Sequence, residues 1–278
     1  MCLVQLLLIR SLVATFWKKP YHQKLIRWGS ELHDRFMMSH YVKKDMEEII
    51  EYLNEEGIAF DKQWLEPFYE FRFPILGRVM VDEMELTLRA AIEPWNVLGE
   101  EISSTGTARF VDSSMERVEV LLRNFNADRY KLLCNRTIVP LNATSTPLQF
   151  VAGVRYKAWA PPSALHPTKG VDSPLVFDIY DTWNKRAIGG CIYHVMHPGG
   201  RGYDTFPVNA IEAEGRRFTR FYEENHSPQV PSVFLNQQVS VNGTKYAVEP
   251  SIEKVNLITP MEPPKNENYP FTLDLQSL

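Results

Sequence analysis

The sequence has 278 residues, of which 44% are hydrophobic, so the chain can bury one large core or two modest ones. Charged residues make up 23%, and the formal net charge is −4. Neither nucleic acid nor an acidic membrane is therefore an expected partner. The three cysteines are widely separated, which predicts no disulfide framework and is typical of the reducing cytoplasm.

Residues 1–17 are almost entirely apolar, and they favour a buried helix over a signal peptide or a membrane span. No basic residue precedes the apolar run, no small-residue cleavage site follows it, and Arg10 interrupts it. Because few domains begin inside an apolar helix, we expect polypeptide upstream of Met1 to cover it. The positions at helical spacing, which predict the buried face, are Leu3, Leu6, Leu7, Arg10, Val13, Ala14 and Trp17.

The helical pattern continues to residue 72. A second segment is expected over Trp28–Met38, and the clearest helix over Ser39–Glu56. Gly57 is well placed to end that helix, and Asp61 can cap a short helix after it. The apolar stripe of the clearest helix consists of Val42, Met46, Ile49, Ile50 and Leu53.

From Phe71 onward the hydrophobic period changes to two, which indicates β-strands. Val79–Val81 and Met84–Arg89 flank two acidic turn residues and predict a hairpin. Because turn residues rather than helices separate the later strands, we expect an antiparallel sandwich-like domain. Those strands are expected at 106–111, 116–124, 129–134, 148–159, 175–180 and 187–196.

A late helix is expected at Asn209–Glu223, and the chain beyond it is polar and punctuated by proline. Near the end, Tyr269–Leu275 is apolar enough to dock as an edge strand. The sequence therefore predicts an α+β chain with a helical segment at 1–72, an antiparallel β domain at 73–225 and an extended, partly ordered tail at 226–278.

The densest polar cluster of the helical segment lies between Arg27 and Arg35. It contains two guanidiniums, the imidazole of His33 and two carboxylates, a set that can bind a phosphate or a carboxylate. Arg10 can join it from the first helix, where a buried charge needs a partner. The alternative is an ion-pair network that staples the two helical segments together.

A second cluster runs from Cys191 to Asp204. Cys191, His194 and His197 are residue types that bind zinc, but on a strand their spacing places neighbours on opposite faces, so no metal site is predicted. The glycine-rich turn around Arg201 can present backbone amides to an anion. A thiolate nucleophile at Cys191 and a purely structural loop are the alternatives.

No familiar enzyme signature is present. The sequence has no Walker loop, no dinucleotide fingerprint, no His-Glu-x-x-His and no Gly-x-Ser-x-Gly. The tryptophan- and proline-rich stretch Trp159–His166 is either a rigid loop or a surface that binds extended peptides.

Seven phrases, taken in order, resemble the C-terminal part of the putative amidoligase family over about residues 1–225. Members of this family are large bacterial proteins that usually carry a transglutaminase-like domain ahead of this region. Phe271–Leu275 resembles the family's usual ending. The seven phrases are Leu6–Arg10, Leu32–Met37, Phe71–Pro74, Glu93–Trp95 with Val97–Glu100, Tyr156–Pro167, Phe177–Trp183 and His197–Asn209.

The resemblance implies an ATP-dependent ligase with a glutamine-synthetase-like fold that joins a carboxylate to an amine. Residues 1–72 would be the last helices of that fold, and the upstream ligase and transglutaminase-like domains would be partners. ATP and Mg²⁺ are expected for the complete protein, whereas this chain alone is expected to bind no cofactor and to be inactive.

Under this hypothesis Arg27 and Arg35 contact phosphate, and His33 orients a group or transfers a proton. The further candidate ligand contacts are Arg10, His197, Arg201 and Asp204.

Two other functions remain open. A non-catalytic binding module would recognise a peptide or protein partner through the β domain. A cysteine hydrolase would use Cys191 as its nucleophile.

Overall fold

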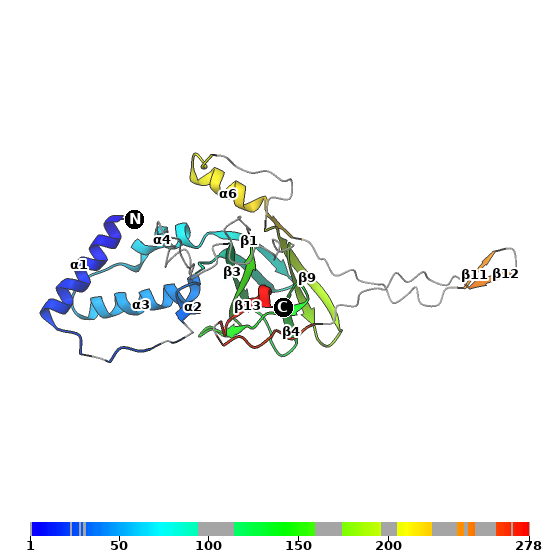
Figure 1. The fold of residues 1–278 in the computed structure, drawn as a ribbon, viewed down its shortest axis with the longest axis horizontal. Helices are drawn as coiled ribbons and strands as arrows, with labels where there is room; N and C mark the ends of the chain where they lie inside the picture. Colours follow the sequence, from blue (N-terminus) through cyan, green and yellow to red (C-terminus); the bar gives the residue numbers. More distant parts are fainter. Residues whose placement is uncertain are drawn as a thin grey trace, which may run out of the picture.

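The structure, a computed structural model, describes residues 2–22, 24–27, 29, 32–93, 114–158, 174–195, 205–223, 238–241, 244–247, 260–267 and 269–277. The helical segment lies to one side of a β-sandwich, and the C-terminal residues return to the sandwich (Figure 1). Among the described residues, no helix has the length and apolar character needed to cross a membrane. The helices, of which η2 and η4 are 3₁₀-helices, are α1 (Cys2–Lys18), α2 (Leu32–Arg35), α3 (Ser39–Glu55), η2 (Lys62–Leu65), α4 (Glu66–Arg72), α6 (Ala210–Phe218) and η4 (Leu275–Ser277).

Two sheets form the sandwich, so the predicted α+β class with an antiparallel sandwich is confirmed. Sheet A contains, in spatial order, β1 (Ile75–Val81), β2 (Met84–Ala90), β3 (Met115–Arg123), β7 (Phe150–Lys157) and β13 (Thr272–Asp274), with β6 (Asn142–Ala143) also paired to β7. Sheet B contains β10 (Phe221–Tyr222), β9 (Arg186–Tyr193), β8 (Leu175–Asp181), β4 (Tyr130–Cys134) and β5 (Thr137–Ile138). A separate hairpin pairs β11 (Gln238–Val241) with β12 (Thr244–Ala247).

The predicted edge strand near the C-terminus is confirmed. It is β13, which pairs with β7 in parallel, whereas the neighbouring pair β3–β7 is antiparallel. The final residues of the chain are therefore an integral part of sheet A.

A hydrophobic core fills the space between the two sheets. Val118, Val120 and Leu122 point into it from β3, and Phe177 and Ile179 from β8, all fully buried. Because side chains alternate along a strand, the intervening residues of β3 point away from this core, toward the helical segment.

The helix α3 begins and packs as the sequence predicts. Ile50 and Leu53 are buried in a cluster that also contains Phe60. Gly57 adopts a positive φ of 87° just past the helix, a conformation that costs glycine little. The Asp61 carboxylate accepts a hydrogen bond from the Gln63 N–H at 2.9 Å and caps η2.

The face of α1 that the sequence predicts to be covered is not covered by the described residues of this chain. Val4, Leu8 and Leu12 pack against the α3–α4 cluster, whereas the predicted stripe is exposed, with Leu6 at 64% and Trp17 at 90%. Because α1 is apolar on nearly every side, its periodicity does not determine which face is covered.

Other boundaries also differ from the predicted ones. Within Trp28–Met38 the described helix is only α2, and the late helix ends at Phe218, after which the chain forms β10. Asn209 caps that helix through a 2.8 Å hydrogen bond from the Glu212 N–H. The strand expected at 106–111 lies outside the described residues.

The outer face of sheet A is covered by the junction with the helical segment. Met38 and Tyr41 pack against Leu121 of β3. The Glu119 carboxylate of β3 accepts a hydrogen bond at 2.9 Å from the backbone N–H of His40, in the first turn of α3. A side chain of the sheet therefore caps α3 and fixes where the helix starts.

The burial of the Glu119 carboxyl makes the stability of the fold depend on pH. Burial raises the pKa of Glu119 from 4.5 to about 7. Because the folded state then binds the proton more tightly than the unfolded state, the contribution of this carboxyl to the free energy of unfolding is fully present below the unfolded pKa and is lost as the pH rises through about 7. The loss amounts to about 3 kcal/mol.

Urea unfolding of the wild type and of Glu119→Gln between about pH 4 and 8 measures this loss. We expect the stability of the wild type to fall with rising pH relative to the glutamine variant. Parallel pH profiles for the two proteins would contradict the assignment.

Candidate functional site

The cluster predicted between Arg27 and Arg35 is divided in the structure. Arg10 and Arg27 are exposed, and the side chain of His33, which belongs to α2, lies outside the described atoms. Arg35 is half-buried, donates to Asp45 at 2.5 Å and lies 5.8 Å from the centre of the Tyr41 ring.

The ion pairs of this region agree in part with the alternative interpretation, in which the charged residues form a structural ion-pair network. Asp34 and Arg35 are both in ion pairs, but their partners are Arg117 in sheet A and Asp45 in α3. These contacts staple α2 to the sheet and to α3 rather than to α1.

Arg117 of β3 is buried beneath the helical segment and binds carboxylates from two other parts of the chain. Its Nη1 donates to Asp34 Oδ1 at 3.1 Å, and its Nε donates to Glu93 Oε1 at 2.7 Å. Asp34 also accepts from the Thr272 hydroxyl at 2.5 Å and from the Phe271 backbone N–H at 2.9 Å. One carboxylate thus joins α2, β3 and the C-terminal strand.

A second arginine extends this arrangement. Arg155 of β7 lies opposite Arg117 in the sheet register, and Glu93 bridges the two, with Arg155 Nε donating to Glu93 Oε2 at 3.0 Å. Arg155 Nη1 donates to Asp274 Oδ2 at 3.1 Å. The Tyr269 ring lies 5.2 Å from the guanidinium of Arg117 and 5.4 Å from that of Arg155.

These contacts define the Arg117 network, which consists of Asp34, Glu93, Arg117, Arg155, Thr272 and Asp274. Carboxylates already engage both guanidiniums, so the network acts as a buried brace and not as a site for a phosphate.

A second group of ionisable side chains lies at the same end of sheet A, on its inner face. Glu116 of β3 is paired in register with Tyr156 of β7. The hydroxyl of Tyr156 is hydrogen-bonded to that of Tyr193 in β9, with the rings 6.4 Å apart. The Arg220 guanidinium lies 4.8 Å from the Tyr193 ring. We call these four residues the Glu116 cluster.

Burial shifts the pKa values of three groups in this cluster. Burial raises the pKa of Glu116, and the nearby Glu93 raises it further, while Arg220 opposes the shift. Burial also raises the pKa values of Tyr156 and Tyr193, so both phenols stay neutral near pH 7. Glu116 is therefore a more basic carboxylate than usual, next to neutral hydrogen-bond donors.

The cluster lies where the chain enters two of the predicted functional segments. Trp159–His166 follows shortly after Tyr156, and His197, Arg201 and Asp204 follow shortly after Tyr193. All of these residues lie outside the described part of the chain. The guanidinium of Arg220 holds the end of β9 here, because it donates to the carbonyls of His194 and Val195.

Cys191 does not have the surroundings of a nucleophile. The residue is fully buried, and this burial raises the pKa of its thiol, which keeps the sulfur protonated. The ring of His194 packs edge-on against Tyr222 with 5.1 Å between centroids. Within the described residues, no group of three or more His, Cys, Asp or Glu side chains is arranged to hold a metal ion.

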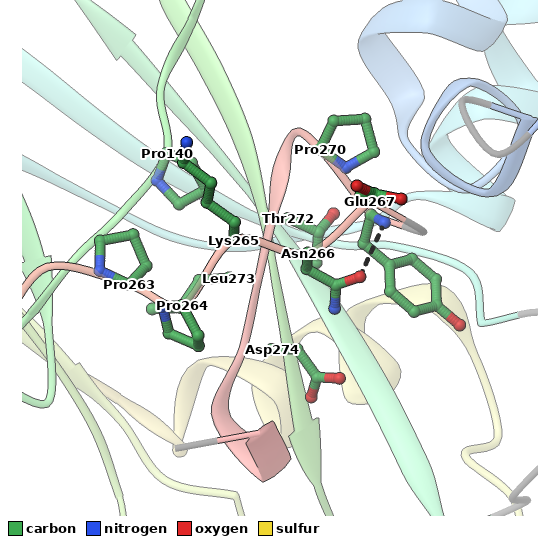
Figure 2. Close-up of a pocket in the computed structure, with 11 residues that line it drawn as sticks. Pro140, Pro263, Pro264, Lys265, Asn266, Glu267, Pro270, Thr272, Leu273 and Asp274 are labelled. Carbon is green, nitrogen blue, oxygen red and sulfur yellow. Dashed lines mark hydrogen bonds between the residues drawn. The ribbon is translucent and has the colours of Figure 1, made fainter.

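A cavity of about 380 Å³ opens beside β13 (Figure 2). Pro140, Pro263 and Pro264 line one side of it, and Asn266 Oδ1 accepts a hydrogen bond from the Tyr269 N–H at 3.3 Å on another. Apolar walls next to a sheet edge, with a polar rim, are typical of sites that take an extended peptide or a small ligand.

Neither charged group of sheet A was predicted from the sequence. The strand around Glu116 and Arg117 has an alternating pattern, in which charges are normally exposed on one face. Here consecutive charges point to opposite faces of a central strand, and both faces are covered. Charges at adjacent positions of a central strand are the signal that could have found them, because each then needs a buried partner.

The Arg117 network predicts very different costs for two neighbouring substitutions. Asp34→Ala leaves a buried guanidinium without its carboxylate and is expected to lower the free energy of unfolding by about 3–5 kcal/mol. Arg35→Ala removes a partly exposed ion pair, worth about 1 kcal/mol or less. Urea unfolding of the two variants measures both values, and equal losses would show that Asp34 is not the central contact.

The chain belongs to the family described as "Putative amidoligase enzyme (DUF2126)", whose family model matches residues 1–276. The match confirms the family that the sequence resembles. No curated protein and no solved structure matches the chain.

Proposed function

We propose that this member of the putative amidoligase family forms part of an ATP-dependent carboxylate–amine ligase and is inactive without further ligase polypeptide. The observation that carries the proposal is the family match over residues 1–276. The bacterial source, the transglutaminase-like partner domain and the cytoplasmic location implied by the resemblance belong to the same proposal.

The described residues do not fit an ATP–magnesium site. The guanidiniums of Arg117 and Arg155 are engaged by carboxylates. A metal-binding group of three or more acidic or imidazole side chains is not found among the described residues. No step is therefore assigned to ATP or Mg²⁺ here, and the proposal assigns both to the additional ligase polypeptide.

In this proposal the Glu116 cluster serves the amine. Joining an amine to an activated carboxylate forms the C–N bond, expels the leaving group from the carbonyl carbon and releases one proton from nitrogen. Glu116 accepts that proton, because its desolvated carboxylate is more basic than a solvated one. The hydroxyl oxygens of neutral Tyr156 and Tyr193 orient the amine next to Glu116.

The candidates near α2 keep their proposed roles on the phosphate side. Arg27 is exposed and free to meet a phosphate brought by the additional polypeptide. Arg35 would have to exchange its partner Asp45 for a phosphate, and His33 would orient a group or transfer a proton. Arg10, on the exposed side of α1, would be a further contact.

The exposed apolar face of α1 supports the need for additional polypeptide. Leu3, Leu6, Ile9 and Val13 are between 58% and 68% exposed, and Trp17 is 90% exposed. Exposed apolar surface of this extent is typical of an interface.

Amide formation tests the ligase proposal. The chain, with and without the polypeptide encoded directly upstream of Met1, is mixed with ATP, Mg²⁺ and candidate carboxylates and amines, and ADP release is measured. We expect turnover only in the combined sample, with kcat reduced about 100-fold or more by Glu116→Gln. Glu85→Gln, in the neighbouring strand β2, is the matched control and should leave turnover unchanged.

Each result bears on a separate part of the proposal. Absence of ADP release from the combined sample with any substrate pair would contradict the ligase function. Turnover that ignores Glu116→Gln would remove Glu116 from the site, and turnover that ignores Arg27→Ala and Arg35→Ala would remove the two arginines.

A second function, recognition of an extended peptide by the β domain, is favoured by the cavity beside β13. Its walls of Pro140, Pro263 and Pro264 next to a sheet edge suit a peptide strand. In this case partner capture survives Arg27→Ala and Arg35→Ala but is lost when Leu273, which lines the cavity, is replaced by Asp or when the Trp159–His166 loop is disrupted.

The α1 face gives a further prediction. Leu6→Glu with Val13→Glu should weaken the complex with the additional ligase polypeptide in sedimentation experiments without lowering the unfolding temperature of the chain, because both side chains are exposed. Leu8→Glu, on the packed face of the same helix, is the control and should lower the unfolding temperature. Equal destabilisation by both changes would show that the exposed face is already covered.

A further inference from the structure

A second cavity, of about 590 Å³, lies on the opposite edge of the sandwich from β13. It is bounded by the end of α4, by β1 of sheet A, by β10 of sheet B and by α6. None of its lining residues belongs to the Arg117 network or to the Glu116 cluster. A volume of this size holds a small metabolite.

The floor of this cavity is built around Gly77. A Cβ atom at this position would lie 2.2 Å from the ring of Phe221, so the ring occupies the space that any side chain at residue 77 would need. Together with Phe218, Phe221 gives the cavity an aromatic surface against which an apolar group can pack.

Arg217 provides a hydrogen-bond donor that lacks an acceptor. Its Nε is buried and has no hydrogen-bond partner in the described structure. The neighbouring arginines of this region differ, since Arg216 binds Glu212 and the Thr205 carbonyl, and Arg220 binds two carbonyls. An acceptor atom on a ligand in this cavity would satisfy this donor.

The charges around Arg217 restrict the chemistry of that ligand. Arg78 lines the same cavity and adds a second guanidinium, while Glu70, Glu214 and Glu223 add three carboxylates. A phosphate or another multiply charged anion would be repelled by the carboxylates. A ligand with one carboxylate and one ammonium group can pair its carboxylate with the arginines and its ammonium group with the glutamates.

We propose that this cavity binds a free α-amino acid with an apolar side chain. The ligand carboxylate binds Arg217 and Arg78, its ammonium group faces Glu214 and Glu223, and its side chain packs on Phe218 and Phe221. The proposal requires binding alone and is independent of the ligase function.

Calorimetric titration of the full chain with three probes tests the site. L-Phenylalanine carries both charges, N-acetyl-L-phenylalanine lacks the ammonium group, and phenethylamine lacks the carboxylate. We expect L-phenylalanine to bind at millimolar concentrations and each of the other two to bind about tenfold more weakly or worse.

Two variants locate the binding. Arg217→Gln should weaken L-phenylalanine about tenfold, whereas Arg216→Gln, on the same helix but outside the cavity lining, should leave its affinity unchanged. Gly77→Ala should also abolish binding by displacing Phe221, and circular dichroism checks that each variant is folded.

Several results would overturn the inference. They are no binding of L-phenylalanine, equal binding of phenethylamine, or an affinity for L-phenylalanine that is the same in folded Arg217→Gln as in the wild type. None of these measurements uses ATP. A negative result for amino-acid binding therefore does not contradict the ligase proposal, and a negative ligase assay does not contradict amino-acid binding.

Discussion

The attachment of the helical segment and the C-terminal strand to sheet A depends on the buried contact between Asp34 and Arg117. The Asp34 carboxylate accepts hydrogen bonds from Arg117, from the Thr272 hydroxyl and from the Phe271 N–H, and so connects the helical segment, sheet A and the C-terminal strand. Both charged side chains are fully buried. Loss of either partner would leave an unpaired charge in a medium of low dielectric, which is costly. In the intact network the opposite charges compensate each other. This difference in free energy favours the one arrangement of the helical segment, sheet A and the C-terminal strand.

The Asp34–Arg117 contact lies directly behind the Glu116 cluster, because side chains alternate between the two faces of a strand. Glu116 and Arg117 are consecutive in β3, as are Arg155 and Tyr156 in β7, and each pair places one side chain on either face of sheet A. Glu93 bridges the two arginines on the outer face, directly behind the strand positions that present Glu116 and Tyr156 on the inner face. A buried ionic brace behind a site is one way to hold reactive groups in a defined geometry.

Local patterns predicted the elements but not the contacts between them. The period-two alternation and the turn residue Asp82, which adopts a positive φ, were enough to identify the β1–β2 hairpin. The amphipathic pattern was enough for α3. In α1 the pattern did not identify the face that packs on α3 and α4, because a helix that is apolar on every side has no preferred face. The partnership of Asp34 with Arg117 spans 83 positions, and nothing local identifies it. For the same reason the sequence grouped Asp34 with its neighbours Arg27, His33 and Arg35 as one cluster.

Hydrogen exchange in the variant Asp34→Asn tests the central role of this contact most directly, because asparagine keeps the shape and removes the charge. The amides of Phe271 and Gly153 lie on the two sides of the β13–β7 pairing, and the Phe271 amide donates to Asp34 itself. We expect both amides to lose protection in the variant, together with the first turn of α3, while the β8–β9 hairpin on the other sheet keeps its protection. Unchanged protection of β13 and of the start of α3 would contradict the account.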